Sequence, residues 1–152
     1  MIDIKNKLLT DRYICNVLKI NNANNKTLDK IAYMLDNGQN FLQFKQGTSS
    51  LSDYFEILLK IRQLCPIYNA ILIVEDRIDI AKMIGADGIF ISNNSIKYKF
   101  LSKIIDDDMI IGSDIINSDF SNYVISDVNV ENKLTYVINN DKAKYQAIYE
   151  VL

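Results

Sequence analysis

Short apolar segments alternate with stretches of helical periodicity along most of the chain. This alternation is typical of βα units packed around a parallel sheet. We predict seven strands from the apolar segments: Cys15–Ile20, Phe41–Gln46, Ala70–Glu75, Gly88–Ser92, Met109–Ile115, Tyr123–Asp127 and Leu134–Asn139.

Helical periodicity fills the gaps between the first five strands. Apolar residues recur at i, i+3, i+4 and i+7 from Leu28 to Leu35, and Gly38 follows as a C-terminal stop. Ser50 and Asp53 resemble a capping box at the start of the next helix. We predict four helices: between Thr27 and Gly38, between Ser50 and Pro66, from Arg77 to Ile84 and from Ser95 to Ile105.

The helical pattern weakens after Ile115. Residues 117–122 span barely one helical turn, and residues 128–133 are too few for an ordinary crossover helix. Helical spacing returns near the C-terminus, at Tyr145, Ile148, Tyr149 and Leu152. We therefore predict a helix over 141–152 and no eighth strand.

These elements predict a single domain over residues 1–152. The expected fold class is α/β, a TIM-type (β/α) barrel shortened to about seven parallel strands, with eroded crossovers in its C-terminal half that leave its closure open. The alternative is an open doubly wound α/β sheet. An incomplete barrel exposes strand edges, which a homodimer could cover through the predicted C-terminal helix.

Composition and charge exclude several classes of function. The 152 residues are 49% hydrophobic, which is enough for a substantial core. A net charge of −2 argues against nucleic acid or an anionic membrane as a partner. No apolar segment reaches the length of a membrane span and the N-terminus lacks a signal-peptide pattern, so we predict a cytoplasmic protein.

Histidine is absent, which excludes His-dependent catalytic triads and the commonest zinc sites. The two cysteines, Cys15 and Cys65, have neither a C-x-x-C partner nor the spacing of metal ligands. We expect both to be buried, reduced thiols.

The segment from Ile73 to Ser92 contains a strand, a helix and a second strand, and reads I-V-E-D-R-I-D-I-A-K-M-I-G-A-D-G-I-F-I-S. It resembles the run I-I-N-D-R-V-D-L-A-L-x-x-G-A-D-G-V-H-L-G of thiamine phosphate synthases and their TenI-type relatives. The likeness is most specific at Asp76–Ala81 and Gly85–Gly88, and it extends over roughly residues 13–140. It implies a barrel and a transfer of hydroxymethylpyrimidine from its diphosphate to a thiazole phosphate, assisted by Mg²⁺.

The resemblance places ligand-binding residues at the mouth, where the carboxyl ends of the barrel strands converge. At the end of the second predicted strand the family has the pattern Q-x-R-x-K, and this chain has Gln43 and Lys45 at the first and third of these positions. At the end of the third strand the family has Asn-Asp, and this chain has Glu75 and the metal candidate Asp76. After the fourth strand, Ser95 stands where the family has a carboxylate that completes its metal site. Lys45 could instead simply reach solvent, while Asp76 and Ser95 could each cap a helix.

Further candidates lie on the later strands. The family pattern I-I-G-x-S becomes Ile110–Asp114, which gives Ser113 as a candidate ligand and Asp114 as a second metal candidate. Asn139 stands where the family has a Gly-Gly phosphate cradle, and the five glycines of this chain all precede Ser113. A phosphate cradle usually needs residues that adopt positive φ, so Asn139 is a weak substitute.

These substitutions make the predicted mouth acidic, because Lys45 stands against four carboxylates: Glu75, Asp76, Asp114 and Asp127. A carboxylate about 5 Å from a diphosphate oxygen costs on the order of 3 kcal/mol at an effective dielectric near 20. Two such changes would weaken diphosphate binding by roughly 10⁴-fold.

Three hypotheses about function follow. The first is a divergent thiamine phosphate synthase with weak or lost activity, which binds a phosphorylated thiamine precursor and Mg²⁺. The second is a non-catalytic module on a degenerate barrel that binds a small molecule or a protein. The third is an acid/base enzyme that uses Asp76 or Asp114 in a new reaction.

Overall fold

The computed structural model describes residues 14–92, 103–113, 122–125, 134–139 and 143–152. Its eight strands form one sheet in the order β6-β5-β4-β3-β2-β1-β8-β7. The strands are β1 (Ile14–Ile20), β2 (Phe41–Gln46), β3 (Ile71–Glu75), β4 (Gly88–Ile91), β5 (Ile110–Ser113), β6 (Tyr123–Val124), β7 (Leu134–Asn139) and β8 (Ala143–Val151).

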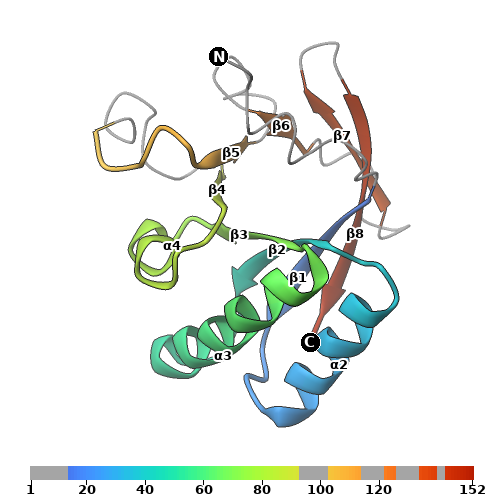
Figure 1. Ribbon diagram of the computed structural model, residues 1–152, viewed down its shortest axis with the longest axis vertical. Helices are drawn as coiled ribbons and strands as arrows, with labels where there is room; N and C mark the ends of the chain where they lie inside the picture. The colour runs from blue at the N-terminus through green and yellow to red at the C-terminus, as the bar shows by residue number, and fades with distance from the viewer. Residues whose placement is uncertain (1–13, 93–102, 114–121, 126–133, 140–142) are drawn as a thin grey trace.

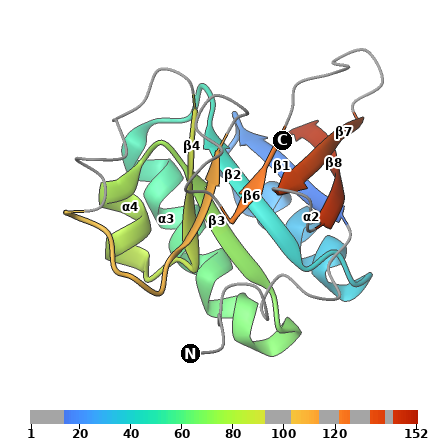
Figure 2. The same ribbon diagram turned by 90° about the horizontal axis from the view of Figure 1, so that it is seen from above.

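Adjacent strands from β6 through β1 to β8 are parallel, and β7 alone among the described strands is antiparallel to its neighbour. Figures 1 and 2 show the sheet curving around an interior, with the helices on its outer side. Cα atoms of β6 and β7 approach within 8 Å, although no ladder joins these two edges in the described residues. The fold is therefore α/β, a partial TIM-type barrel, as the sequence predicts.

The helices of the first half begin and end close to their predicted positions. They are α2 (Asn25–Asp36), α3 (Leu51–Leu64) and α4 (Ile78–Ile84), with a 3₁₀ turn at Cys65–Tyr68 that contains Pro66. The Ser50 side chain accepts a hydrogen bond from the Asp53 amide at 3.1 Å, which confirms the predicted cap. Within the described residues, no helix is long and apolar enough to cross a bilayer.

Two apolar layers pack on the opposite faces of the sheet. Because side chains alternate along a strand, Leu18, Leu42 and Leu72 face the helices, where they join Ile31 and Leu58. The intervening positions fill the barrel interior with a second cluster: Cys15, Val17, Phe41, Ile71, Ile73, Phe90, Ile110, Tyr123, Ile125 and Ala147. Burying one of the larger apolar side chains typically contributes about 1.5–3 kcal/mol, so both layers stabilise the fold.

The predicted C-terminal helix over 141–152 is wrong, because residues 143–151 form the strand β8. The same residues also alternate with period two, with apolar side chains at positions 143, 145, 147, 149 and 151. A strand satisfies this alternation and pairs with β1 on one side and β7 on the other. An eighth strand therefore exists, and the prediction that the seventh is parallel to its neighbour is also wrong.

The predicted helix over 95–105 lies largely outside the described residues, and its described residues 103–105 form a turn and a bend rather than a helix. The thin crossovers at 117–122 and 128–133 also fall almost wholly outside the described part of the chain. Apart from β6, the predicted strands start and stop within two residues of the predicted boundaries. Strand β6 ends at Val124 rather than Asp127, and residues 126–127 lie outside the described part of the chain.

Candidate functional site

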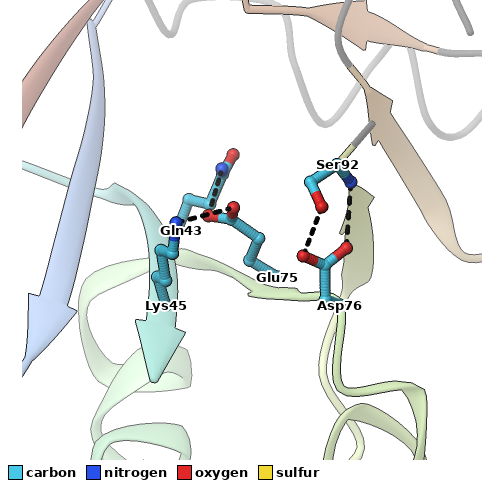
Figure 3. Close-up of polar contacts among 5 residues, drawn as sticks. All are labelled: Gln43, Lys45, Glu75, Asp76 and Ser92. Atoms are coloured by element: carbon cyan, nitrogen blue, oxygen red, sulfur yellow. Dashed lines mark hydrogen bonds and ion pairs between the residues drawn. The ribbon is translucent and has the colours of Figure 1, made fainter. Parts of the chain in front are cut away.

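The candidate site lies at the mouth of the barrel, where β2, β3 and β4 end beside one another (Figure 3). Alternation along β2 places Phe41, Gln43 and Lys45 on the same side, and Phe41 belongs to the interior cluster. Glu75 follows Ile73 on the interior side of β3 in the same way. The parallel register therefore brings three of the predicted site residues, Gln43, Lys45 and Glu75, together.

Gln43 is 1% exposed and lies inside a chain of hydrogen bonds. Its amide oxygen accepts a hydrogen bond from the Tyr123 hydroxyl at 2.6 Å and faces the Cys15 thiol at 3.9 Å. Its amide nitrogen donates to Glu75 Oε2 at 3.5 Å. Both polar ends of the Gln43 side chain are therefore engaged within the protein.

Tyr123 is a member of the site that the sequence prediction missed. Its ring crosses the interior from β6 and meets Phe41 edge-on, with ring centroids 5.3 Å apart. A Cβ atom at residue 112 would overlap the Tyr123 ring, so the glycine there leaves room for it. In the sequence, the local signal that the Tyr123 side chain points into the interior is its spacing of two residues from Ile125, which is also interior.

Glu75 and Lys45 form an ion pair, with 3.8 Å between Lys45 Nζ and Glu75 Oε1. The Glu75 side chain is 9% exposed and that of Lys45 is 53% exposed. Burial raises the pKa of Glu75 to about 7, against the opposing effect of the Lys45 ammonium; the neighbouring Asp76 raises it further and the Gln43 hydrogen bond lowers it. Lys45 thus reaches solvent with its charge already facing a carboxylate.

Asp76 contacts Ser92 at the ends of β3 and β4. One carboxylate oxygen accepts from the Ser92 amide at 2.9 Å, and the other accepts from the Ser92 hydroxyl at 2.6 Å (Figure 3). Asp76 has a φ of 60°, a conformation unusual for a residue other than glycine. The contact with Ser92 holds this strained turn in place.

The alternative that Asp76 caps the following helix is wrong. Helix α4 begins at Ile78, its N-cap residue is Arg77, and no side chain caps it. The Arg77 guanidinium instead binds the Asp79 carboxylate through two hydrogen bonds, at 3.1 and 2.7 Å.

The remaining candidates are separated from this group or lie outside the described residues. Ser113 is fully buried on β5 and pairs with Ile91, a member of the layer that faces the helices, whereas the site group lies on the interior side. Asn139 ends β7 opposite Ala143, and its side chain lies outside what the structure describes. Ser95 and Asp114 lie outside the described residues, as does Asp127.

Mg²⁺ needs several oxygen ligands in near-octahedral geometry. Within the described ranges, no three acidic or cysteine side chains gather where they could hold a metal ion. Of the two predicted metal ligands, Asp76 uses both oxygens to bind Ser92 and Asp114 falls outside these ranges. The described residues therefore do not by themselves supply a Mg²⁺ site.

Comparison with known proteins identifies the family. The model of the thiamine monophosphate synthase (TMP-TENI) family matches residues 13–119. The chain belongs to this family. Thiamine-phosphate synthase of Caldicellulosiruptor saccharolyticus is 35% identical over 85 residues, which cover 56% of this chain and 38% of that protein.

The thiamine-phosphate synthase of Campylobacter jejuni strain RM1221 is 27% identical over 109 residues, which cover 72% of this chain and 51% of that enzyme. The chain thus spans about half the length of the curated family members it matches, or less. The solved thiamine phosphate pyrophosphorylase of Pyrococcus furiosus superposes with a TM-score of 0.58 at 22% identity, and covers 74% of this chain and 52% of its own. That likeness shows the fold.

Proposed function

We propose that the chain is a divergent thiamine phosphate synthase-like protein, related to thiamine biosynthesis, with weak or lost synthase activity. The family reaction joins hydroxymethylpyrimidine, carried as its diphosphate, to a thiazole phosphate. The observation that carries the proposal is the burial of Gln43, which is 1% exposed and bonded through both ends of its amide to Tyr123 and Glu75.

A ligand that bound through Gln43 would have to break these internal contacts. Removing one partner from a buried hydrogen bond leaves the other unsatisfied, which costs about 1–3 kcal/mol. The Phe41, Phe90 and Tyr123 rings pack together beside Gln43, so the interior at this level is filled by the protein's own side chains. This packing is a reason to expect that a ligand binds only weakly at the mouth.

The other retained candidates support the same conclusion. Asp76 binds Ser92 through both carboxylate oxygens, and Lys45 is paired with Glu75. Family membership makes a phosphorylated thiamine precursor the ligand to test first, with Mg²⁺ as the metal. We place the protein in the cytoplasm with this pathway.

A direct assay tests the proposal. The chain is incubated at high concentration with hydroxymethylpyrimidine diphosphate, thiazole phosphate and Mg²⁺, and thiamine phosphate is quantified beside the Campylobacter jejuni synthase as a control. We expect product formation roughly 10⁴-fold slower than the control, or none, from the loss of two favourable charge interactions. Turnover within tenfold of the control would overturn the proposal.

Because Asp76 and Lys45 are engaged by Ser92 and Glu75, a second candidate is a non-catalytic module that binds a small molecule or a protein. It predicts no turnover together with a rise in melting temperature when a ligand binds, because binding to the folded state stabilises it. Thermal-shift measurements with each thiamine precursor, with and without Mg²⁺, show whether a small molecule binds. A flat response in every measurement would reject the small-molecule form of this candidate.

A further inference from the structure

The cations at the ends of β2 and β3 already face carboxylates. Lys45 Nζ lies 3.8 Å from Glu75 Oε1, and the Arg77 guanidinium is bound by Asp79. The two pairs differ in burial, because the Glu75 carboxylate is inside the barrel whereas Asp79 is well exposed. A buried carboxylate is screened less by solvent, so the pair at Lys45 carries more electrostatic weight.

The position of Glu75 is fixed from several sides. Gln43 donates to its second oxygen, and Tyr123 orients the Gln43 amide by donating to its carbonyl. Glu75 is also in the last position of a strand whose burial is continuous. The carboxylate therefore has little freedom to move away when an anion approaches Lys45.

We propose that Glu75 is the specificity-determining residue of the mouth, which excludes diphosphate-bearing ligands by neutralising Lys45 and repelling the anion. A ligand without a negative charge near Glu75 escapes this penalty. The inference rests on the proposed function, since it assigns to one side chain the discrimination against the family's diphosphate substrate. At an effective dielectric near 20, one carboxylate about 5 Å from an anionic oxygen lowers affinity by roughly 10²-fold.

Calorimetric titration with inorganic pyrophosphate at pH 8, without metal, tests this assignment. The variant Glu75→Gln keeps the shape of the side chain and removes its charge. We expect it to bind pyrophosphate about 10–100-fold more tightly than the unmodified protein. Adding Lys45→Met to Glu75→Gln should reduce the gain, because the part of it that comes from the freed Lys45 charge is then lost.

The matched control is Glu150→Gln, which removes the same charge from a surface ion pair with Lys30. We expect its pyrophosphate affinity to change less than twofold. A Glu75→Gln variant that binds no more tightly than Glu150→Gln would overturn the proposal. So would a gain that keeps its full size after Lys45 is replaced, because Glu75 would then not act through Lys45.

Lys45→Met in the otherwise unmodified protein gives a test that does not depend on the folding of any Glu75 variant. If Glu75 neutralises Lys45, this change should alter pyrophosphate affinity less than threefold, and a tenfold loss would contradict the assignment. The product assay with organic substrates is independent of these titrations. Rapid turnover would reject the proposed weak activity, whereas only the titrations decide the role of Glu75.

Discussion

Glu75 shows how a single interior carboxyl can affect both binding and stability. Its side chain is almost fully buried, so removal from water disfavours the ionised form and raises the pKa to about 7. The Lys45 ammonium opposes this effect without cancelling it. The protein therefore carries a charge whose ionisation weakens the fold near neutral pH.

We predict that Glu75 makes stability fall as the pH rises from about 4.5 to 7. The folded state binds more protons than the unfolded state in this window, so the free energy of unfolding decreases with pH and then levels off above 7. A shift from 4.5 to about 7 corresponds to about 3 kcal/mol. Urea unfolding of the unmodified protein and of Glu75→Gln, measured at several pH values, tests this. Between pH 4.5 and 7 the free energy of unfolding should fall more steeply with pH in the unmodified protein than in the variant.

The comparison between the two proteins isolates Glu75, because all other titrating groups are shared. Glu75→Gln should gain relative stability as the pH rises and should reach its full advantage above pH 7. If the free energies of unfolding of the two proteins differ by the same amount at every pH between 4.5 and 8, Glu75 titrates normally and the prediction is wrong.

At the scale of elements, the packing of β5 against β6 depends on Gly112. The Tyr123 ring occupies the space where a side chain at this position would lie. Tyr123 also packs against Phe41 and donates to Gln43, so it connects the short strand β6 with β2 across the interior. The fit between Gly112 and Tyr123 is thus a requirement for the candidate site.

We predict that Gly112→Ala destabilises the protein by about 1–3 kcal/mol, the usual cost of overpacking a core. Tyr123→Leu should also destabilise it, because the ring packing and the hydrogen bond to Gln43 are lost. The double variant should be more stable than the sum of the two losses predicts, since the smaller side chain makes room for the added methyl group. Chemical denaturation of all four proteins measures this coupling, and strict additivity would contradict the contact.

Local sequence patterns determine much of the fold, and particular residues show which parts depend instead on contacts distant in the sequence. Ser50, Gly38 and the apolar spacing of α2 and α3 act within a few residues, so the first half could be predicted closely. Residues 143–151 fit both a helical and a strand period, and only pairing with β1 and β7 decides between them. Gln43, Lys45 and Glu75 could be predicted as neighbours from strand ends, whereas the contact of Tyr123 spans 80 residues of sequence.

The whole molecule depends on β8, because this strand connects the C-terminus to the start of the barrel. It pairs along β1 from Ile14 to Lys19 and continues the sheet to β7. The Leu152 amide donates to the Lys19 carbonyl at 2.8 Å, and the Leu152 carbonyl accepts from the Asn21 amide at the same distance. A homodimer stays a prediction, but its expected contact, a C-terminal helix, is replaced by a strand within the sheet.

The position of β8 predicts different effects for two substitutions on this strand. Ala147 is fully buried in the interior cluster beside Cys15, whereas Val151 is 61% exposed. Ala147→Asp places an unpaired carboxylate in the interior and should cost at least about 3 kcal/mol or prevent folding. Val151→Asp, the matched control, should cost less than about 1 kcal/mol because its side chain stays in water.

Thermal and chemical denaturation of the two variants tests whether β8 closes the interior of the barrel. The helix first predicted would pack through its stripe at Tyr145, Ile148, Tyr149 and Leu152, which leaves residues 147 and 151 together on the opposite, exposed face. Small losses at both positions would therefore support that arrangement and contradict the strand. A large loss confined to Ala147→Asp requires a C-terminal segment that packs into the barrel beside β1, and so makes the last residues of the chain part of its core.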